Sequence, residues 1–168
     1  MVFRVASGTG GGGGTFVAGG YGMFVSTANQ TNPVASTANP LALDTQIDGA
    51  SGVTNNNGVL TFTTAGVWQI MFELAFTSSV GANPVISQWL VKNGSNVANT
   101  AQDFQLLGGA NTVQMSTCVF MLNNIVNDTV QVYWSSSDTR VSLSYQGALT
   151  TPARPASPSA IVFVNRVG

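Results

Sequence analysis

Residues 67–76 alternate between large apolar and mixed side chains with a period of two. A β-strand turns successive side chains to opposite faces, so this pattern predicts a strand with one face in a core. The predicted core face consists of Trp68, Ile70, Phe72, Leu74 and Phe76. The opposite face is mixed and suits water, a second sheet or a partner subunit. Its residues are Val67, Gln69, Met71, Glu73 and Ala75.

Short apolar runs separated by turn residues predict further strands from residue 21 onward. We expect these strands at residues 21–27, 59–63, 86–92, 104–107, 112–122, 129–134, 141–145 and 160–164. No stretch has a convincing helical period of 3.6, so about nine or ten short strands predict an all-β sandwich or jelly roll. The last strand closes the chain, and we expect it in the centre of a sheet.

Turn chemistry divides these strands. Asn93 and Gly94 both accept a positive φ, which predicts a type I′ hairpin. Residues 51–58 include three consecutive asparagines and predict a turn. Residues 151–159 carry three prolines and predict a stiff loop that cannot pair in a sheet.

The composition excludes several classes of function. Only 7% of the 168 residues are charged, against about 25% in an average domain, and the formal net charge is −1. No basic stripe is available for phosphates, so we expect no nucleic-acid partner. Without histidine, the chain cannot build a His-based triad, general base or zinc site. No run of 18 apolar residues occurs, so we expect no membrane partner. A surface with so little charge favours self-association.

The first 20 residues form a separate glycine-rich leader, and residues 21–168 form the predicted domain. Glycine this dense loses too much backbone entropy to hold regular structure alone. The leader is either a flexible linker or a tether with a small anchor at its start. The anchor would consist of Val2, Phe3, Arg4 and Val5. The apolar stretch is too short for a secretory signal, so we expect the protein to stay where it is made.

Few residues are candidates for chemistry. Glu73 is the one acid inside a strongly apolar strand, and it either faces solvent or forms an intersubunit pair with Arg140 or Arg166. Cys118 lies among apolar residues and is expected to be a small buried hydrophobe, because a nucleophilic cysteine needs a base. We therefore predict no catalytic residues and no enzyme activity; a polysaccharide hydrolase would need two carboxylates across a cleft.

An oxygen-rich loop is the one candidate for a metal. Asp44 and Asp48 precede the asparagines at 55–57, and calcium prefers such oxygen ligands. The spacing matches no calcium-loop motif, and Asx residues are common in turns for their own reasons. We expect no cofactor, with calcium as the alternative.

Aromatic side chains are candidates for stacking on sugars. They are Trp68, Trp89, Tyr133, Trp134 and Tyr145. Trp68 is better explained by the core face. Trp134 is followed by Ser135-Ser136-Ser137-Asp138, which predicts a position near a sheet end where it faces a ligand.

From residue 21 to the C-terminus the chain resembles the C1q/TNF-like jelly-roll family. The matching pieces are Phe62-x3-Gly66-x-Trp68-x-Ile70, Trp89-Leu90-Val91-Lys92-Asn93-Gly94, Asn127-Asp128-Thr129-Val130-Gln131-Val132 and Ala160-Ile161-Val162-Phe163-Val164. Within that family it is most similar to small C1q-like domains of phages and other viruses. Residues 134–139 and 151–159 are similar to runs seen in viral structural proteins of phages.

The resemblance implies a ten-stranded, two-sheet sandwich that forms a homotrimer, with one sheet around the threefold axis. Core and trimer packing would then involve the predicted core face together with Phe163. It also implies a noncatalytic knob on a phage capsid or head fibre, made in the host cytoplasm and carried on the exterior of the virion. Its partner would be another virion protein, a capsid protein or a fibre base. The alternative is a receptor- or carbohydrate-binding module at a tail-fibre tip, with a host surface glycan or receptor as partner.

Overall fold

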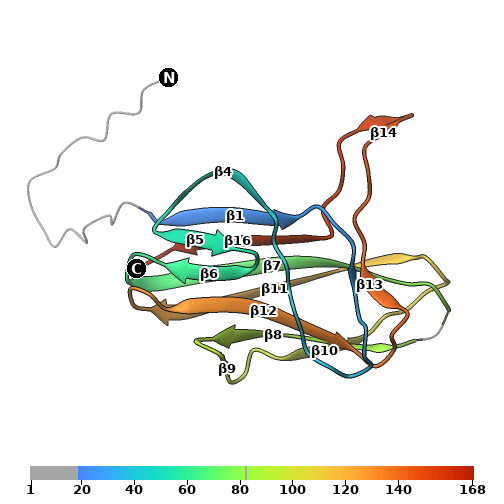
Figure 1. Ribbon diagram of the computed structural model, residues 1–168, viewed down its shortest axis with the longest axis horizontal. Helices are drawn as coiled ribbons and strands as arrows, with labels where there is room; N and C mark the ends of the chain where they lie inside the picture. Colours follow the sequence, from blue (N-terminus) through green and yellow to red (C-terminus); the bar gives the residue numbers. More distant parts are fainter. Residues whose placement is uncertain (1–18, 82) are drawn as a thin grey trace, which may run out of the picture.

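The computed structural model describes residues 19–81 and 83–168 (Figure 1). These residues form 16 strand segments, and no helix occurs among them. Ten of the segments have four or more residues, close to the predicted number. The other six have two or three residues, and two of these pair only with each other. The predicted all-β class is confirmed.

The long segments form two antiparallel sheets that pack face to face (Figure 1). We call them sheet A and sheet B. Sheet A consists of β1 (Tyr21–Ser26), β2 (Gln30–Thr31), β4 (Thr45–Ser51), β7 (Gly66–Ser78), β11 (Val113–Asn124), β13 (Val141–Leu143) and β16 (Ala160–Arg166). Sheet B consists of β3 (Asn39–Pro40), β5 (Val53–Asn56), β6 (Val59–Phe62), β8 (Val85–Lys92), β9 (Ser95–Asn96), β10 (Gln102–Gln105) and β12 (Thr129–Ser136).

Strand β7 lies in the middle of sheet A and pairs with strands on both of its edges. One edge of β7 pairs along its length with β11, and the other edge pairs with β16 and then with β13. Strand β16 lies between β7 and β1, and β4 completes the sheet beyond β1. The last strand is therefore central, as predicted. In sheet B the order is β10, β8, β12, β6 and β5.

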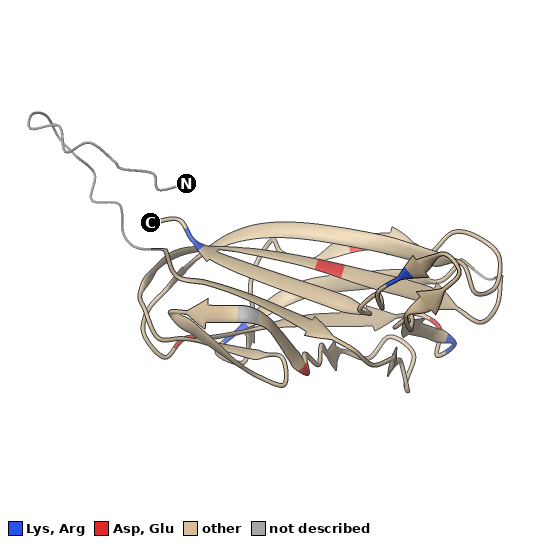
Figure 2. Ribbon diagram, turned by 90° about the horizontal axis from the view of Figure 1, so that it is seen from above, with Lys and Arg blue, Asp and Glu red and all other residues tan. Residues whose placement is uncertain are grey.

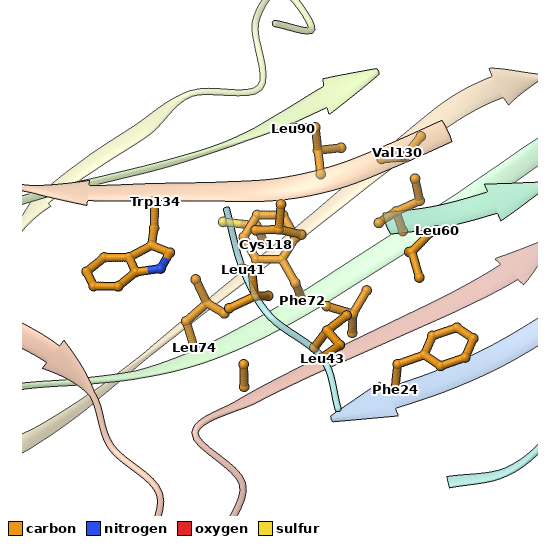
Figure 3. Close-up of a cluster of buried hydrophobic side chains, with 14 of the residues drawn as sticks. Phe24, Leu41, Leu43, Leu60, Phe72, Leu74, Leu90, Cys118, Val130 and Trp134 are labelled. Atoms are coloured by element: carbon orange, nitrogen blue, oxygen red, sulfur yellow. The ribbon is translucent and has the colours of Figure 1, made fainter. Parts of the chain in front are cut away.

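The core lies between the two sheets and is built from the alternation described above (Figure 3). The five residues of the predicted core face on β7 have no exposed surface. Phe62 packs edge-on against Trp68, with ring centroids 4.8 Å apart. Burying large aromatic side chains removes 150–250 Å² each from water, which makes this cluster a main source of stability.

The hairpin predicted at Asn93-Gly94 is present. Asn93 has φ 50° and Gly94 has φ 78°, the positive values that a type I′ turn requires. A second turn of this kind joins β5 to β6 at Asn57 and Gly58. The prediction of a turn over residues 51–58 is wrong in part, because Val53 to Asn56 form the edge strand β5.

The prediction that residues 151–159 cannot pair is also wrong. Ala153 and Arg154 form β15 and pair with β14 (Leu149–Thr150). A further bridge joins Gln146 to Ser157. The prolines flank these paired residues and take no part in the ladder, which is why they are compatible with it. Residues 146–157, which we call the arm, stand away from both sheets (Figure 1).

Two of the predicted site residues lie on unexpected sides of a sheet. Trp134 is fully buried between the sheets, so the prediction that it faces a ligand is wrong (Figure 3). Strand β12 continues to Ser136, and the backbone carbonyl of Ser136 accepts hydrogen bonds from Asn32 and Ser36, so a loop covers this end. Phe163 alternates with the buried Val162 and Val164 and points away from the core, so it does not pack in the core, and its predicted part in trimer packing stays a prediction.

Candidate functional site

The outer face of sheet A, which we call the A face, carries an apolar row across five strands, with polar side chains on either side of it. The register of the sheet places one side chain from each strand in a single row. This row consists of Ile47, Met23, Phe163, Met71 and Val119. Because side chains in one row of a sheet are neighbours, they form a continuous apolar band.

Exposed apolar residues concentrate on this face. Among the described residues, 13 large hydrophobic side chains are exposed. Seven of them have outward positions in sheet A or directly after it. They are Tyr21, Ile47, Val67, Met115, Val119, Met121 and Val167. Met121 is the most exposed of the seven, at 63%. A contiguous apolar surface of this kind marks a site of association.

Strand β11 contributes much of the A face, and sequence reasoning assigned it no role. The outward residues of β11 recur at every second position from Met115 to Met121. The sequence shows the same alternation, which is the one signal it offers for this face. It could not show which side of the strand faces the core, because Cys118 and Phe120 on the inner side are also apolar.

The outer face of sheet B, which we call the B face, has a different chemistry. Its outward positions are mainly hydroxyl, amide and carboxylate side chains, with one aromatic pair at the centre. The polar positions are Thr54, Asn56, Thr61, Ser87, Asp103, Gln105, Thr129, Gln131 and Ser135. The two outer faces therefore differ: the A face suits contact with protein, and the B face suits contact with water.

The aromatic pair on the B face consists of Trp89 and Tyr133. They are directly opposite on β8 and β12, with ring centroids 6.0 Å apart and planes inclined by 33°. The indole N–H of Trp89 donates to Oδ1 of Asn96 at 2.9 Å, which holds the ring in place. Of the aromatic residues considered for sugar stacking, these two are partly exposed on a sheet face, while Trp68 and Trp134 are buried.

Glu73 lies on the A face, between Thr117 of β11 and Ile161 of β16. It is half-buried, and none of the described residues forms a salt bridge with it. Charged positions are sparse over the whole molecule (Figure 2). A lone carboxylate on an apolar face remains solvated as long as the face is uncovered.

The two predicted partners of Glu73 lie elsewhere in the protomer. Arg140 forms a salt bridge with Asp138 in its own loop. Arg166 is opposite Trp68 in the register, so it belongs to the inner face of sheet A. It is five positions along β16 from Ile161, the residue opposite Glu73. Five residues of a strand span about 17 Å. The structure therefore brings neither arginine to Glu73 within one protomer.

A polar network closes the end of the sandwich near Asp128. The Asp128 carboxylate accepts hydrogen bonds from the side chains of Lys92 and Asn93 and from the backbone N–H of Ile125. These interactions lower the pKa of Asp128 to about 2, and the hydrogen bond from Lys92 contributes most to this shift. The network joins the β8–β9 hairpin to the β11–β12 loop and is structural.

Cys118 is buried, as predicted. Its Sγ accepts from Nε2 of Gln88 at 2.8 Å and donates to Oε1 of Gln102 at 3.1 Å. Burial raises the pKa of the Cys118 thiol, and the hydrogen bond from Gln88 opposes this. The thiol is therefore held in its protonated, unreactive form.

The oxygen-rich loop considered for calcium serves the backbone instead. The Asp44 carboxylate accepts from Thr27 and Thr45, and Asn55 bonds the carbonyl of Leu43 and the N–H of Gly58. The side chain of Asp48 lies outside the described part. No group of three or more acidic or cysteine side chains placed to hold a metal occurs in residues 19–81 and 83–168 as far as they are described.

Two further predictions concern other parts of the chain. The anchor residues Val2, Phe3, Arg4 and Val5 lie outside the described residues. Among the residues that are described, no helix is long and apolar enough to cross a membrane.

Comparison with known proteins gives a likeness in structure alone. No family model matches the sequence, and no curated protein matches it. Murine APRIL superimposes with a TM-score of 0.55 at 10% identity, covering 89% of this chain and 99% of that one. The Eiger TNF protein of S. frugiperda gives 0.56 at 12% identity, covering 89% and 93%. The globular domain of the zebrafish complement 1qA protein gives 0.51 at 10%, covering 86% and 94%.

These neighbours share the arrangement of strands over almost their whole length, while the sequence identity is too low to carry function. The chain therefore has the C1q/TNF-like jelly-roll fold.

Proposed function

We propose that this protein is a noncatalytic structural knob that forms a homotrimer through the A face. The observation that carries the proposal is the contrast between the two outer faces. Association through the A face would remove Met115, Val119 and Met121 from water, and each large apolar side chain buried contributes about 1.5–3 kcal/mol. The polar B face then forms the outside of the assembly.

The first test is the native mass of the full chain across a wide range of concentrations. Three subunits of 17.3 kDa give about 52 kDa. Sedimentation equilibrium is expected to give this mass at micromolar concentration. A monomer throughout the range contradicts the trimer.

The virion role is the finer part of the proposal and is supported by the sequence resemblance to phage structural proteins. In this proposal the knob sits on a capsid or head fibre, with residues 2–5 inserted into another virion protein. Deleting residues 1–14 is expected to leave the trimer intact and to abolish its attachment to particles. Unchanged occupancy of the particles by the deleted protein contradicts the tether.

Location on the particle is tested by imaging virions labelled with an antibody against residues 21–168. Label over the head supports the capsid or head-fibre knob. Label at the tail supports the alternative of a host-recognition tip. Absence of label from all particles contradicts the virion role altogether.

The alternative, a carbohydrate-binding module, is favoured by one observation, the Trp89–Tyr133 pair on the B face. The pair presents partly exposed rings among hydroxyl and amide side chains, the combination that sugars require for stacking and hydrogen bonding. Glycan-array binding that is lost in Trp89→Ala and Tyr133→Ala, with the native mass unchanged, supports this function. Equal binding by wild type and both variants contradicts it.

A further inference from the structure

The arm is the part of the described chain that the sandwich uses least. Its backbone bonds run within the arm, between Gln146 and Ser157 and between β14 and β15. Almost all of its residues are exposed, including Leu149 at 47%. It rises across the strand direction and passes beyond the edge formed by β1 and β4 (Figure 1). A self-paired projection of this kind is positioned to contact another molecule.

The arm leaves and rejoins the sandwich at one level of β7. The N–H of Ser144, just before the arm, donates to the carbonyl of Ala75 at 2.8 Å. The N–H of Ala75 donates to the carbonyl of Ser159, just after the arm, at 3.0 Å. Glu73 is two residues from Ala75 and on the same side of the sheet. The arm therefore starts at the level of the lone carboxylate of the A face.

Covering the A face changes the situation of Glu73. A carboxylate that is taken out of water without a cationic partner is strongly destabilising. In a threefold assembly each of the three subunits would bury one such carboxylate. A cation that reaches Glu73 from another subunit would therefore favour association through this face.

The described residues include four cationic side chains. Two of them already form salt bridges, and a third lies on the wrong face of sheet A to reach a neighbour's Glu73. Lys92 is paired with Asp128, and Arg140 is paired with Asp138. Arg166 is on the inner side of sheet A, five residues along β16 from the position opposite Glu73. The remaining cation is Arg154.

Arg154 lies on the arm, and its guanidinium bonds neutral acceptors only: the side-chain carbonyl of Gln146 at 3.2 Å and the backbone carbonyl of Pro155 at 3.0 Å. It has no acidic partner among the described residues. Exchanging these neutral acceptors for a carboxylate would strengthen the hydrogen bonds of Arg154, because charge-assisted hydrogen bonds are about twice as strong as neutral ones.

We propose that the arm of each subunit crosses to the neighbouring subunit and pairs its Arg154 with Glu73 on the neighbour's A face. This inference rests on the trimer proposed above. A rotation about an axis along the strands keeps every residue at its own level, so an arm that projects sideways at Ala75 meets the neighbour near its Glu73. The pair neutralises the carboxylate that the apolar interface would otherwise bury alone.

The closing experiment uses the full chain with two introduced cysteines, Glu73→Cys and Arg154→Cys. Native Cys118 is buried and serves unchanged as the background. A short bis-maleimide cross-linker is expected to join each subunit to the next and to give a covalent trimer on a denaturing gel. The linker is used because the two long side chains of an Arg–Glu pair hold their Cα atoms farther apart than the about 4.4–6.8 Å that a disulfide spans. The matched control, Glu73→Cys with Arg140→Cys, is expected to give no link between subunits.

The outcomes separate this inference from the trimer itself. A native trimer whose cross-link forms within one chain, or does not form, overturns the arm contact and leaves the trimer standing. A wild-type chain that is monomeric overturns both. An arm that binds a host ligand instead would leave the trimer unaffected by any change at Arg154, which also overturns the proposal.

Charge reversal provides a second measurement that needs no cross-link. Glu73→Arg and Arg154→Glu are each expected to weaken trimer association at least tenfold. The double variant is expected to recover most of this loss, because it restores the pair with exchanged signs. Additive losses in the double variant overturn the pairing, even where each single variant folds and dissociates.

Discussion

The ammonium group of Lys92 lies 2.7 Å from the carboxylate of Asp128, and this pair ties the end of β8 to the loop before β12. Asn93 and the N–H of Ile125 complete the shell of the carboxylate. Asp128 is 7% exposed, so water replaces little of this shell when it is lost.

The first prediction concerns this carboxylate. Asp128→Asn is expected to lower the free energy of unfolding by about 1–2 kcal/mol, because hydrogen bonds to a charged acceptor are lost. Urea unfolding at pH 7 measures the change. Asp138→Asn is the matched control: its pair with Arg140 is on the surface, and a much smaller change is expected. Equal losses in the two variants contradict the assignment.

The same carboxylate gives the protein an acid-sensitive element. The pKa of Asp128 is lowered from 3.8 to about 2 in the folded state. A group whose pKa is lowered on folding stabilises the fold above its unfolded pKa. This contribution is therefore complete above about pH 5 and is lost as the pH falls from about 4 through 2. Asp128→Asn is expected to flatten this part of the stability–pH curve, and an unchanged curve would exclude Asp128 as its cause.

The A face is expected to control association and not folding. Val119→Lys and Met121→Lys each place a charge on the proposed interface, and the trimer dissociation constant is expected to rise at least tenfold, about 1.4 kcal/mol. Gln131→Lys on the B face is the control and is expected to leave the constant unchanged. Analytical ultracentrifugation measures association, and circular dichroism checks that each variant folds.

Trp134 is expected to act through stability alone. Its ring packs edge-on against Phe76, with centroids 5.7 Å apart, and it is fully buried. Trp134→Ala is expected to cost about 3–5 kcal/mol. Trp89→Ala, on the B face, is expected to cost far less. Thermal unfolding ranks the two variants, and a smaller loss for Trp134→Ala than for Trp89→Ala would refute the buried position.

Gly58 is expected to tolerate no side chain. It has φ 94°, and a Cβ there would lie 1.9 Å from the carbonyl oxygen of Leu41. Gly58→Ala is expected to cost about 2–4 kcal/mol through the backbone strain and the clash. Gly94 also has a positive φ but has open space around it, so Gly94→Ala is expected to cost about 1–2 kcal/mol. Chemical unfolding of both variants separates the clash from the strain.

The predictions made from the sequence were correct where neighbouring residues decide the outcome. The alternation in residues 67–76 identified the core face of β7, and Asn93-Gly94 identified a hairpin. They failed at the ends of strands. The serines after Trp134 suggested a sheet end open to a ligand, but a loop from residues 32–36 covers it. The prolines after Thr150 hid the pairing of β14 with β15.

Period, turn chemistry and composition are local properties of the chain, so the sequence alone determined the all-β class, the core-facing side of β7 and the absence of histidine chemistry. The tertiary structure decided the rest, because it depends on contacts between residues far apart in the chain. Only the pairing of β7 with β11 and β16 assembles the apolar row of the A face, and only the path from β13 to β16 raises Arg154 on an arm whose base lies beside Ala75, two residues from Glu73.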